Sequence, residues 1–250
     1  MMREETVFGP IHSRRLGRSL GINLLPVGGK ICNFDCIYCE CGWNRDGRGD
    51  TQLPTAAKVR ADLENKLIDL MLQGTAIDSI TFSGDGEPTL NPEFPRIIDD
   101  TLMLRDAYYP GAKVSVLSNA TRVHLDSVFE ALRKVDNPIM KIDAPTDDLA
   151  ARINHPAPGY IVRRTVEALK RFEGDFILQT MFLKSSDFDS ASPEVLEPWM
   201  DIVRELRPRL VQVYSIDRPT PAAGLQKYST EQMKALVEPL LDEGFNIQFR

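Results

Sequence analysis

The residues best suited to chemistry are four cysteines gathered in one short segment. Cys32, Cys36, Cys39 and Cys41 are the only cysteines among the 250 residues, and all four fall within ten consecutive positions. Such clustering excludes a disulfide framework that ties distant elements together, and it favours metal or redox chemistry. Three thiolates at the spacing of Cys32, Cys36 and Cys39 can hold three corners of a [4Fe–4S] cluster. The fourth iron would then stay open to an external ligand, as catalytic zinc keeps one position open.

Two other metal sites would use the same cysteines. A structural zinc ion could take all four, although such sites usually draw on two separated Cys-x-x-Cys pairs. A ferredoxin-type cluster would use Cys41 as its fourth ligand, although the spacing differs from ferredoxin runs. The three-cysteine cluster is our leading hypothesis. Cys41 is then a surplus, partly buried thiol, with a redox or substrate role as the alternative.

The cysteine segment follows the first strand of a predicted α/β fold. Strand-like and helix-like segments alternate from residue 55 onward, which predicts parallel strands joined by right-handed crossovers. Strands are expected at 20–24, 77–82, 114–117, 139–142, 176–183, 210–214 and 247–249, and helices at 55–73, 92–104, 125–135, 160–172, 193–206 and 230–242. Active sites of parallel α/β proteins lie at the carboxyl ends of strands, which suits the position of the cysteines.

The pattern also predicts one continuous domain. No linker rich in Pro, Gly and Ser interrupts residues 1–250. We expect an N-terminal segment, 1–54, with the first strand and the cysteine loop, followed by repeating β/α units over 55–250. A complete eight-stranded barrel uses about 250 residues. The long opening segment takes too many of them, so a partial barrel fits better, with a doubly wound open sheet as the alternative.

Composition excludes several classes of protein. The chain is 42% hydrophobic and 26% charged, which is typical of a globular protein rather than a disordered, collagenous or coiled-coil one. A net charge of −6 argues against nucleic-acid binding, which needs clustered positive charge. The N-terminus does not resemble a signal peptide, and no run approaches the ~20 apolar residues of a membrane span. We therefore expect a cytoplasmic protein, in a setting where thiols stay reduced.

Two motifs resemble those of the radical S-adenosylmethionine (radical SAM) enzymes. The cysteine segment has the form Cys-x3-Cys-x-aromatic-Cys, with Tyr38 directly before the last cysteine. Ser83-Gly-Asp-Gly-Glu-Pro-Thr-Leu90 is similar to the family's Gly-Gly-Glu-Pro segment, except that Asp85 stands where the usual pattern has glycine. Segments 8–21 and 214–224 resemble a poorly characterised, single-cluster branch. The resemblance covers nearly the whole chain and implies a partial (β/α)6 TIM-like barrel with outer helices.

The resemblance implies the cofactors and their chemistry. Cys32, Cys36 and Cys39 would bind a [4Fe–4S] cluster, and the methionine amino and carboxylate groups of S-adenosylmethionine would bind its fourth iron. Reduction would cleave the sulfonium to a 5′-deoxyadenosyl radical, which removes a hydrogen atom from a substrate. Such an enzyme is oxygen-sensitive and needs a reductant such as flavodoxin or ferredoxin.

Further cofactor contacts are expected in the cysteine loop and near strand ends. Glu87 would face the ammonium of methionine, and Ser118-Asn119 matches the family's ribose-contacting position. Lys141 and Asp143 share a strand face, where they would hold cofactor groups or form a structural ion pair. The candidate cofactor-binding residues are Tyr38, Gly84, Asp85, Gly86, Glu87, Pro88, Ser118, Asn119, Lys141, Asp143 and Gln179.

The substrate is not encoded in these motifs. It is expected to be a small molecule or a residue of a partner protein, and a glycyl-radical-enzyme activase is one alternative. The 4-demethylwyosine synthases carry a second cluster, for which no cysteine follows Cys41. A non-enzymatic iron–sulfur electron-transfer protein is the alternative from another class. Arg14, Arg15 and Arg18 beside His12 form a basic cluster that suggests a solvated surface or an anion site.

Overall fold

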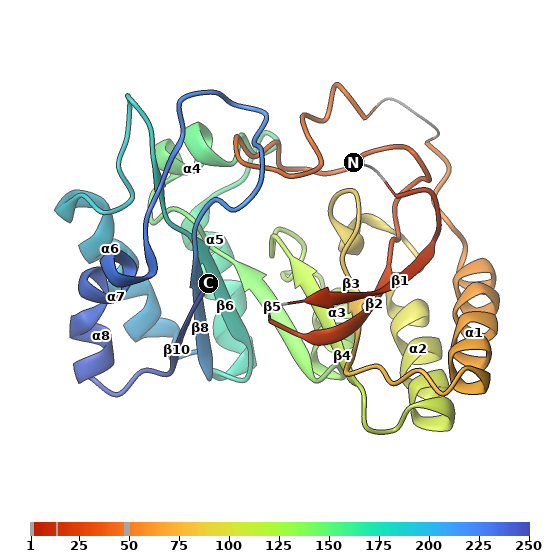
Figure 1. Cartoon of the computed structure of the whole chain (residues 1–250). Helices are drawn as coiled ribbons and strands as arrows, with labels where there is room; N and C mark the ends of the chain where they lie inside the picture. Colours follow the sequence, from red (N-terminus) through yellow and green to blue (C-terminus); the bar gives the residue numbers. More distant parts are fainter. Residues whose placement is uncertain (1–2, 14, 48–50) are drawn as a thin grey trace. The chain divides into compact units, whose positions relative to one another are not determined.

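The computed structural model describes residues 3–13, 15–47 and 51–250. These residues form two units, each assembled from several segments of the chain (Figure 1). Unit 1 consists of Met1–Cys32, Asn44–Ser118 and His124–Pro138, and unit 2 of Asn33–Trp43, Asn119–Val123 and Ile139–Arg250. The prediction of a single domain stays a prediction, and each unit is described by itself.

Unit 1 contains a sheet whose strands run in the order β1-β2-β3-β4. The strands are β1 (Val7–Ser13), β2 (Gly17–Ile22), β3 (Ser79–Phe82) and β4 (Lys113–Ser118). The last three are parallel, as predicted, whereas β1 pairs antiparallel with β2 and was not expected. The register of β1 shifts between Phe8 and Ile11, where Gly9 and Pro10 interrupt the alternation by which a strand is predicted.

The helices of unit 1 are α1 (Ala56–Leu72), α2 (Phe94–Tyr108), α3 (Asp126–Arg133) and the short 3-10 helix η1 (Pro88–Leu90). Figure 1 shows α1 and α2 next to each other. The rings of Phe82 on β3 and Phe94 on α2 lie 6.3 Å apart, edge to face, within an apolar core. Burial of such side chains contributes ~1.5–3 kcal/mol each and secures the helix layer.

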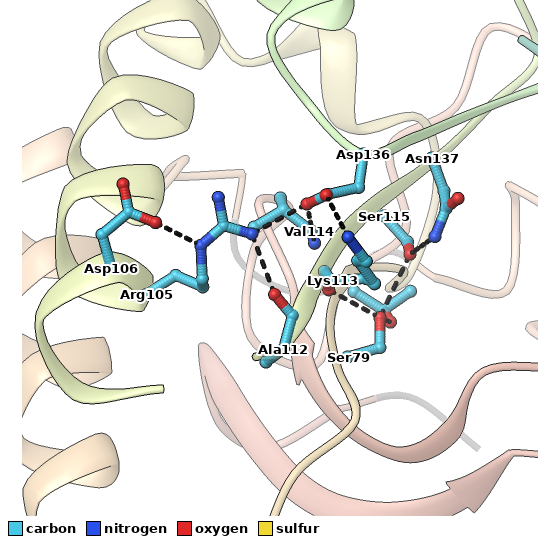
Figure 2. A network of polar contacts seen from close by, with 10 residues as sticks. Ser79, Arg105, Asp106, Ala112, Lys113, Val114, Ser115, Asp136 and Asn137 are labelled. Atoms are coloured by element: carbon cyan, nitrogen blue, oxygen red, sulfur yellow. Dashed lines mark hydrogen bonds and ion pairs between the residues drawn. The ribbon is translucent and has the colours of Figure 1, made fainter. Parts of the chain in front are cut away.

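Polar contacts fasten α2 to β4, as Figure 2 shows. Arg105 Nη1 donates to Asp136 Oδ2 at 2.8 Å, and the same oxygen accepts from the Val114 amide at 2.9 Å. Lys113 Nζ lies 3.0 Å from the other Asp136 oxygen. Burial by itself would raise the pKa of Asp136, but these hydrogen bonds outweigh it, so its pKa is lowered.

Unit 2 contains parallel strands in the order β5-β6-β8-β10. They are β5 (Asn137–Lys141), whose first two residues belong to unit 1, β6 (Ile177–Met181), β8 (Leu210–Tyr214) and β10 (Ile247–Phe249). A separate antiparallel pair consists of β7 (Leu183–Lys184) and β9 (Gln226–Lys227). The helices are α4 (Asp147–Ile153), α5 (Val162–Leu169), the 3-10 helix η2 (Lys170–Phe172), α6 (Pro193–Leu206), α7 (Thr230–Leu236) and α8 (Glu238–Asp242).

The elements of unit 2 differ from the expected ones in three places. The strand expected at 176–183 is divided, because β6 ends at Met181 and Leu183 pairs with β9 instead. The helix expected at 230–242 is two helices, since Pro239 has no amide to continue the α7 hydrogen bonds. Helix α4 was not expected, although Thr146 caps it by accepting from the Leu149 amide.

A row of glutamines crosses the unit 2 strands. Gln179 on β6 donates to Gln212 on β8 at 3.1 Å, and Gln212 donates to Gln248 on β10 at 2.9 Å. These residues are register partners, so the row runs perpendicular to the strands. On the other strand face, the Thr180 hydroxyl accepts from Trp199 Nε1 of α6 at 3.0 Å. The glutamine row therefore lies on the face opposite that helix.

In the part of the chain that the structure describes, no helix has both the length and the apolar composition of a transmembrane span.

Candidate functional site

In unit 1 the segment 83–90 is bound to the residues just before Cys32. Ile31 forms a parallel bridge with Gly86: its amide donates to the Asp85 carbonyl at 3.1 Å, and its carbonyl accepts from the Glu87 amide at 3.1 Å. Gly86 has a φ of +144°, and a Cβ there would lie 2.6 Å from the Ile31 carbonyl carbon. Only glycine fits this close approach. The segment therefore fixes the backbone that leads into Cys32.

Asp85, which replaces the family's glycine, binds other parts of unit 1. Its carboxylate is fully buried, and Oδ2 accepts from the Arg3 amide at 2.6 Å and from Asn23 Nδ2 at 3.3 Å. The Asp85 amide donates back to Asn23 Oδ1 at 3.2 Å. A Cβ on Gly84 would lie 2.6 Å from Asn23 Cγ, so glycine is required there as well. Asp85 thus ties the N-terminal residues and the loop after β2 to the motif.

Glu87 and Ser118, both proposed as cofactor contacts, meet directly. The Ser118 hydroxyl donates to Glu87 Oε1 at 2.8 Å, and the same oxygen accepts from the Thr89 amide at 3.1 Å. Glu87 is 2% exposed and caps η1, whose first residue is Pro88. The buried carboxylate is therefore held in one orientation at the end of β3 and β4.

In unit 2 the segment between Cys32 and Cys39 is held by the end of α4. The Asp35 amide donates to the Asn154 carbonyl at 2.8 Å, and the Ile37 amide donates to the Ile153 carbonyl at 3.0 Å. These two amides flank Cys36, and the carbonyls are ones that a helix end leaves without intrahelical partners. The position of Cys36 is thus set by the C-terminus of a helix that sequence patterns missed.

Asn119 belongs to the same unit and is held by the cysteine segment. Its Nδ2 donates to Asn33 Oδ1 at 2.7 Å, and Asn33 Nδ2 donates to Thr121 Oγ1 at 2.6 Å. Asn119 Oδ1 in turn accepts from Thr121 Oγ1 at 2.7 Å, which closes a ring of three side chains. The predicted pair Ser118-Asn119 is therefore divided, with Ser118 bound to Glu87 in unit 1 and Asn119 to Asn33 in unit 2.

A buried polar network surrounds Tyr38. Its hydroxyl donates to Asp143 Oδ2, and Lys141 Nζ lies 3.4 Å from Asp143 Oδ1, so the predicted Lys141–Asp143 pair is an ion pair. Lys141 Nζ also lies 5.0 Å from the centre of the Tyr38 ring and 4.7 Å from that of Tyr214, and it donates to the Tyr214 hydroxyl. The two rings and the carboxylate stabilise the ammonium of Lys141, whose side chain is 16% exposed.

The charges in this network displace the pKa values. Burial and the adjacent Asp143 carboxylate hold the pKa of Tyr38 well above its usual value. Burial alone would lower the pKa of Lys141, but Asp143 and Tyr214 raise it overall. Tyr38 is thus a neutral phenol and Lys141 a cation at neutral pH. Lys141 offers positive charge for an anionic ligand group but is a poor nucleophile.

Asn154 links this network to Cys36. Its Nδ2 lies 2.7 Å from Asp143 Oδ2, 3.2 Å from the Tyr38 hydroxyl and 3.3 Å from Cys36 Sγ. Burial, with a smaller contribution from Asp143, raises the pKa of the Cys36 thiol to about 11. The thiol therefore keeps its proton at neutral pH until a metal displaces it.

The cysteines offer a donor set suited to iron. All four are partly accessible and none forms a disulfide. The Cys39 amide donates to the Cys36 carbonyl at 3.0 Å, which folds that part of the loop into a turn. Among residues 3–13, 15–47 and 51–250, no three His, Cys, Asp or Glu side chains converge as ligands of a single metal ion. In a cubane cluster each thiolate binds a different iron, and soft sulfur ligands suit iron–sulfur sites, so the chemistry of these side chains fits such a cluster.

Gln179 on β6 is the register partner of Lys141 on β5, and it also belongs to the glutamine row. Arg14 lies outside the described residues, while the Arg15 amide donates to Ser13 Oγ at 3.3 Å. Arg18 forms an exposed ion pair with Asp78 at 3.5 Å, which favours the solvated-surface interpretation.

The side chains at the site that were not predicted include Asn33, Asn154 and Tyr214. Asn33 lies inside the cysteine motif and could have been found there. Asn154 follows α4, which the capping residue Thr146 and two acidic residues in the first turn indicate. Tyr214 ends a predicted strand, the position from which active-site side chains project.

Comparison with known sequences identifies relatives over most of the chain. Residues 27–187 match the Radical SAM superfamily. UPF0026 protein slr1464 from Synechocystis is 32% identical over 222 residues, which cover 86% of this chain and 77% of that protein. GTPase Obg from Brachyspira hyodysenteriae is 28% identical over 237 residues, 93% of this chain, and the chain spans only 33% of its length.

Solved structures share the fold. A radical SAM methyltransferase from Sphaerobacter thermophilus superposes with a TM-score of 0.68 at 18% identity, covering 93% of this chain and 65% of that one. Streptococcus suis SuiB bound to S-adenosylmethionine gives a TM-score of 0.64 at 18% identity, covering 89% and 49%. These likenesses confirm the predicted fold class, a partial α/β barrel of parallel strands with outer helices. The sequence match over residues 27–187 shows that the chain belongs to the radical SAM superfamily.

Proposed function

We propose that this chain binds a [4Fe–4S] cluster through Cys32, Cys36 and Cys39 and S-adenosylmethionine at the remaining iron. These cofactors would supply reductive cleavage of S-adenosylmethionine and a 5′-deoxyadenosyl radical that abstracts hydrogen from a substrate. The observation that carries the proposal is the three-cysteine motif inside a matched superfamily segment, held on both sides by dedicated contacts: Ile31 on Gly86 before Cys32, and the end of α4 around Cys36.

The surrounding residues have separable tasks in this proposal. Glu87, held by Ser118, presents buried negative charge for the methionine ammonium, and Lys141 presents positive charge for a carboxylate. Asn119 is fixed through Asn33, which favours a role beside the ribose hydroxyls. Asp85 also holds the motif in place, because its Oδ2 binds the Arg3 amide and Asn23.

A reductant such as flavodoxin or ferredoxin would supply the electron, and the substrate would be a small molecule or a residue of a partner protein. A cytoplasmic setting suits thiols that must stay reduced. The substrate would decide whether the overall reaction is that of an oxidoreductase or of a lyase. If the substrate is a residue of a partner protein, the enzyme could be a glycyl-radical-enzyme activase.

The test is S-adenosylmethionine cleavage by the anaerobically reconstituted chain. With dithionite as reductant, we expect 5′-deoxyadenosine by chromatography and a change in the cluster's EPR spectrum on adding S-adenosylmethionine. Cys36→Ala should lose both cluster and cleavage, whereas the matched variant Cys41→Ala should keep both. A well-formed cluster that neither cleaves S-adenosylmethionine nor responds to it would favour a non-enzymatic iron–sulfur protein.

A further inference from the structure

The side chain of Asn154 makes three polar contacts, one of them to a cysteine. It is 2% exposed and follows directly after α4. Its Nδ2 lies within hydrogen-bond distance of Asp143 Oδ2, the Tyr38 oxygen and Cys36 Sγ. An amide nitrogen has two hydrogens for these three acceptors, so one hydrogen serves Asp143 and the other points between Tyr38 and Cys36.

Asp143 determines which end of the Asn154 amide faces the sulfur. A carboxylate oxygen only accepts hydrogen bonds, and Asp143 Oδ2 also accepts from the Tyr38 hydroxyl. With 2.7 Å between Asp143 Oδ2 and the amide, the nitrogen rather than the oxygen must point there. The same constraint turns an N–H toward Cys36.

The backbone keeps this arrangement in place. The Asn154 amide donates to the Ala150 carbonyl at 2.8 Å, and its carbonyl accepts from the Asp35 amide at 2.8 Å. Asn154 is therefore bound at both main-chain groups and at its side chain, and one of these bonds joins it to the residue before Cys36. A donor fixed in this way needs little reorganisation when a charge changes beside it.

We propose that Asn154 is a positioning residue for the cluster, whose amide donates a hydrogen bond to the Cys36 thiolate and raises the cluster's midpoint potential. The inference rests on the proposed function. A hydrogen bond to a cluster sulfur stabilises the more negative, reduced state and is one of the factors that set the potential of iron–sulfur sites. The electron then enters the cluster more readily from a given reductant.

The experiment is an EPR-monitored redox titration of the full chain, reconstituted anaerobically and without S-adenosylmethionine. Asn154→Leu removes the donor, and Asn154→Asp replaces it with an acceptor of the same shape. The matched control is Asn137→Leu, since Asn137 is also an asparagine that donates through its side chain, in this case to Ser115 Oγ in unit 1. We expect both Asn154 variants to have a lower midpoint potential than the parent and the control.

Each outcome decides between explanations. A parent chain that takes up no cluster refutes the proposed function, and this inference with it. A parent with a cluster whose potential is unchanged in either loaded Asn154 variant refutes the inference alone. Variants that melt like the parent but hold no cluster support the positioning role, because Cys36 is then misplaced. If both variants unfold at room temperature, the role of Asn154 is structural and the inference is wrong.

Discussion

Replacement of Gly86 by alanine tests the contact that leads into Cys32. The new Cβ would lie 2.6 Å from the Ile31 carbonyl carbon and 3.3 Å from the Cys32 nitrogen, so the bridge must open. Two backbone hydrogen bonds are lost, at ~1 kcal/mol each, and a side chain at φ +144° adds about 1–3 kcal/mol of strain. We expect the free energy of unfolding to fall by roughly 3–5 kcal/mol.

The assay is thermal unfolding of the chain without cofactors, followed by iron analysis after reconstitution. For a chain of this size, each kcal/mol shifts Tm by about 2–4 °C, so we expect a decrease of roughly 6–20 °C. Iron uptake should fall as well, because Ile31 precedes Cys32. Gly111→Ala is the control, since a Cβ there would meet no atom within 4 Å. The reasoning is refuted if Gly86→Ala melts and binds iron like Gly111→Ala.

Three further predictions follow from buried contacts. Asp85→Gly restores the family's residue and removes the hydrogen bond that the Arg3 amide donates, so we expect it to destabilise the fold by ~1–3 kcal/mol. The N-terminal residues should then be cleaved faster by a protease, which mass spectrometry of timed digests measures. Asp136→Asn should lower the free energy of unfolding at pH 7 by ~1–2 kcal/mol. Because the pKa of Asp136 is lowered in the folded state, its contribution to stability is present above pH ~4 and is lost as the pH falls through that pKa. In denaturant titrations at several pH values, the stability of the variant should therefore depend less steeply on acid. Tyr38→Phe should leave Asp143 short of one donor and cost ~1.5–3 kcal/mol in the same titrations, and an unchanged midpoint would contradict the hydrogen bond.

The regular part of the fold could be predicted because periodicity and helix signals agree there. The parallel strands and most outer helices follow from buried apolar runs alternating with amphipathic segments. Strand β1 could not be predicted in this way, because Gly9 and Pro10 interrupt its alternating pattern at a β-bulge. Helix α4 was not predicted because it is only seven residues long and has little apolar periodicity, although Thr146 marks its start.

The site was predicted as a set of residue types, and its contacts were not. The spacing of the cysteines and the match at Gly84–Pro88 are local in sequence. The contacts between side chains are not local in sequence: Asn154 contacts Cys36, 118 positions away, and Asp143 contacts Tyr38, 105 positions away. Asp85 shows the limit most clearly, since its partners Arg3 and Asn23 depend on the N-terminal segment and on the loop after β2.

The glutamine row in unit 2 has a consequence for how its strands align during folding. Buried parallel strands are apolar on both faces, so hydrophobicity alone distinguishes poorly between neighbouring alignments. A slip of β8 by one residue would set Val211 or Val213 opposite Gln179 and leave a buried amide without a partner, at ~1–3 kcal/mol. The glutamine row thus favours the native register of these strands over slipped ones. We expect its three glutamines to be kept together or replaced together in related sequences.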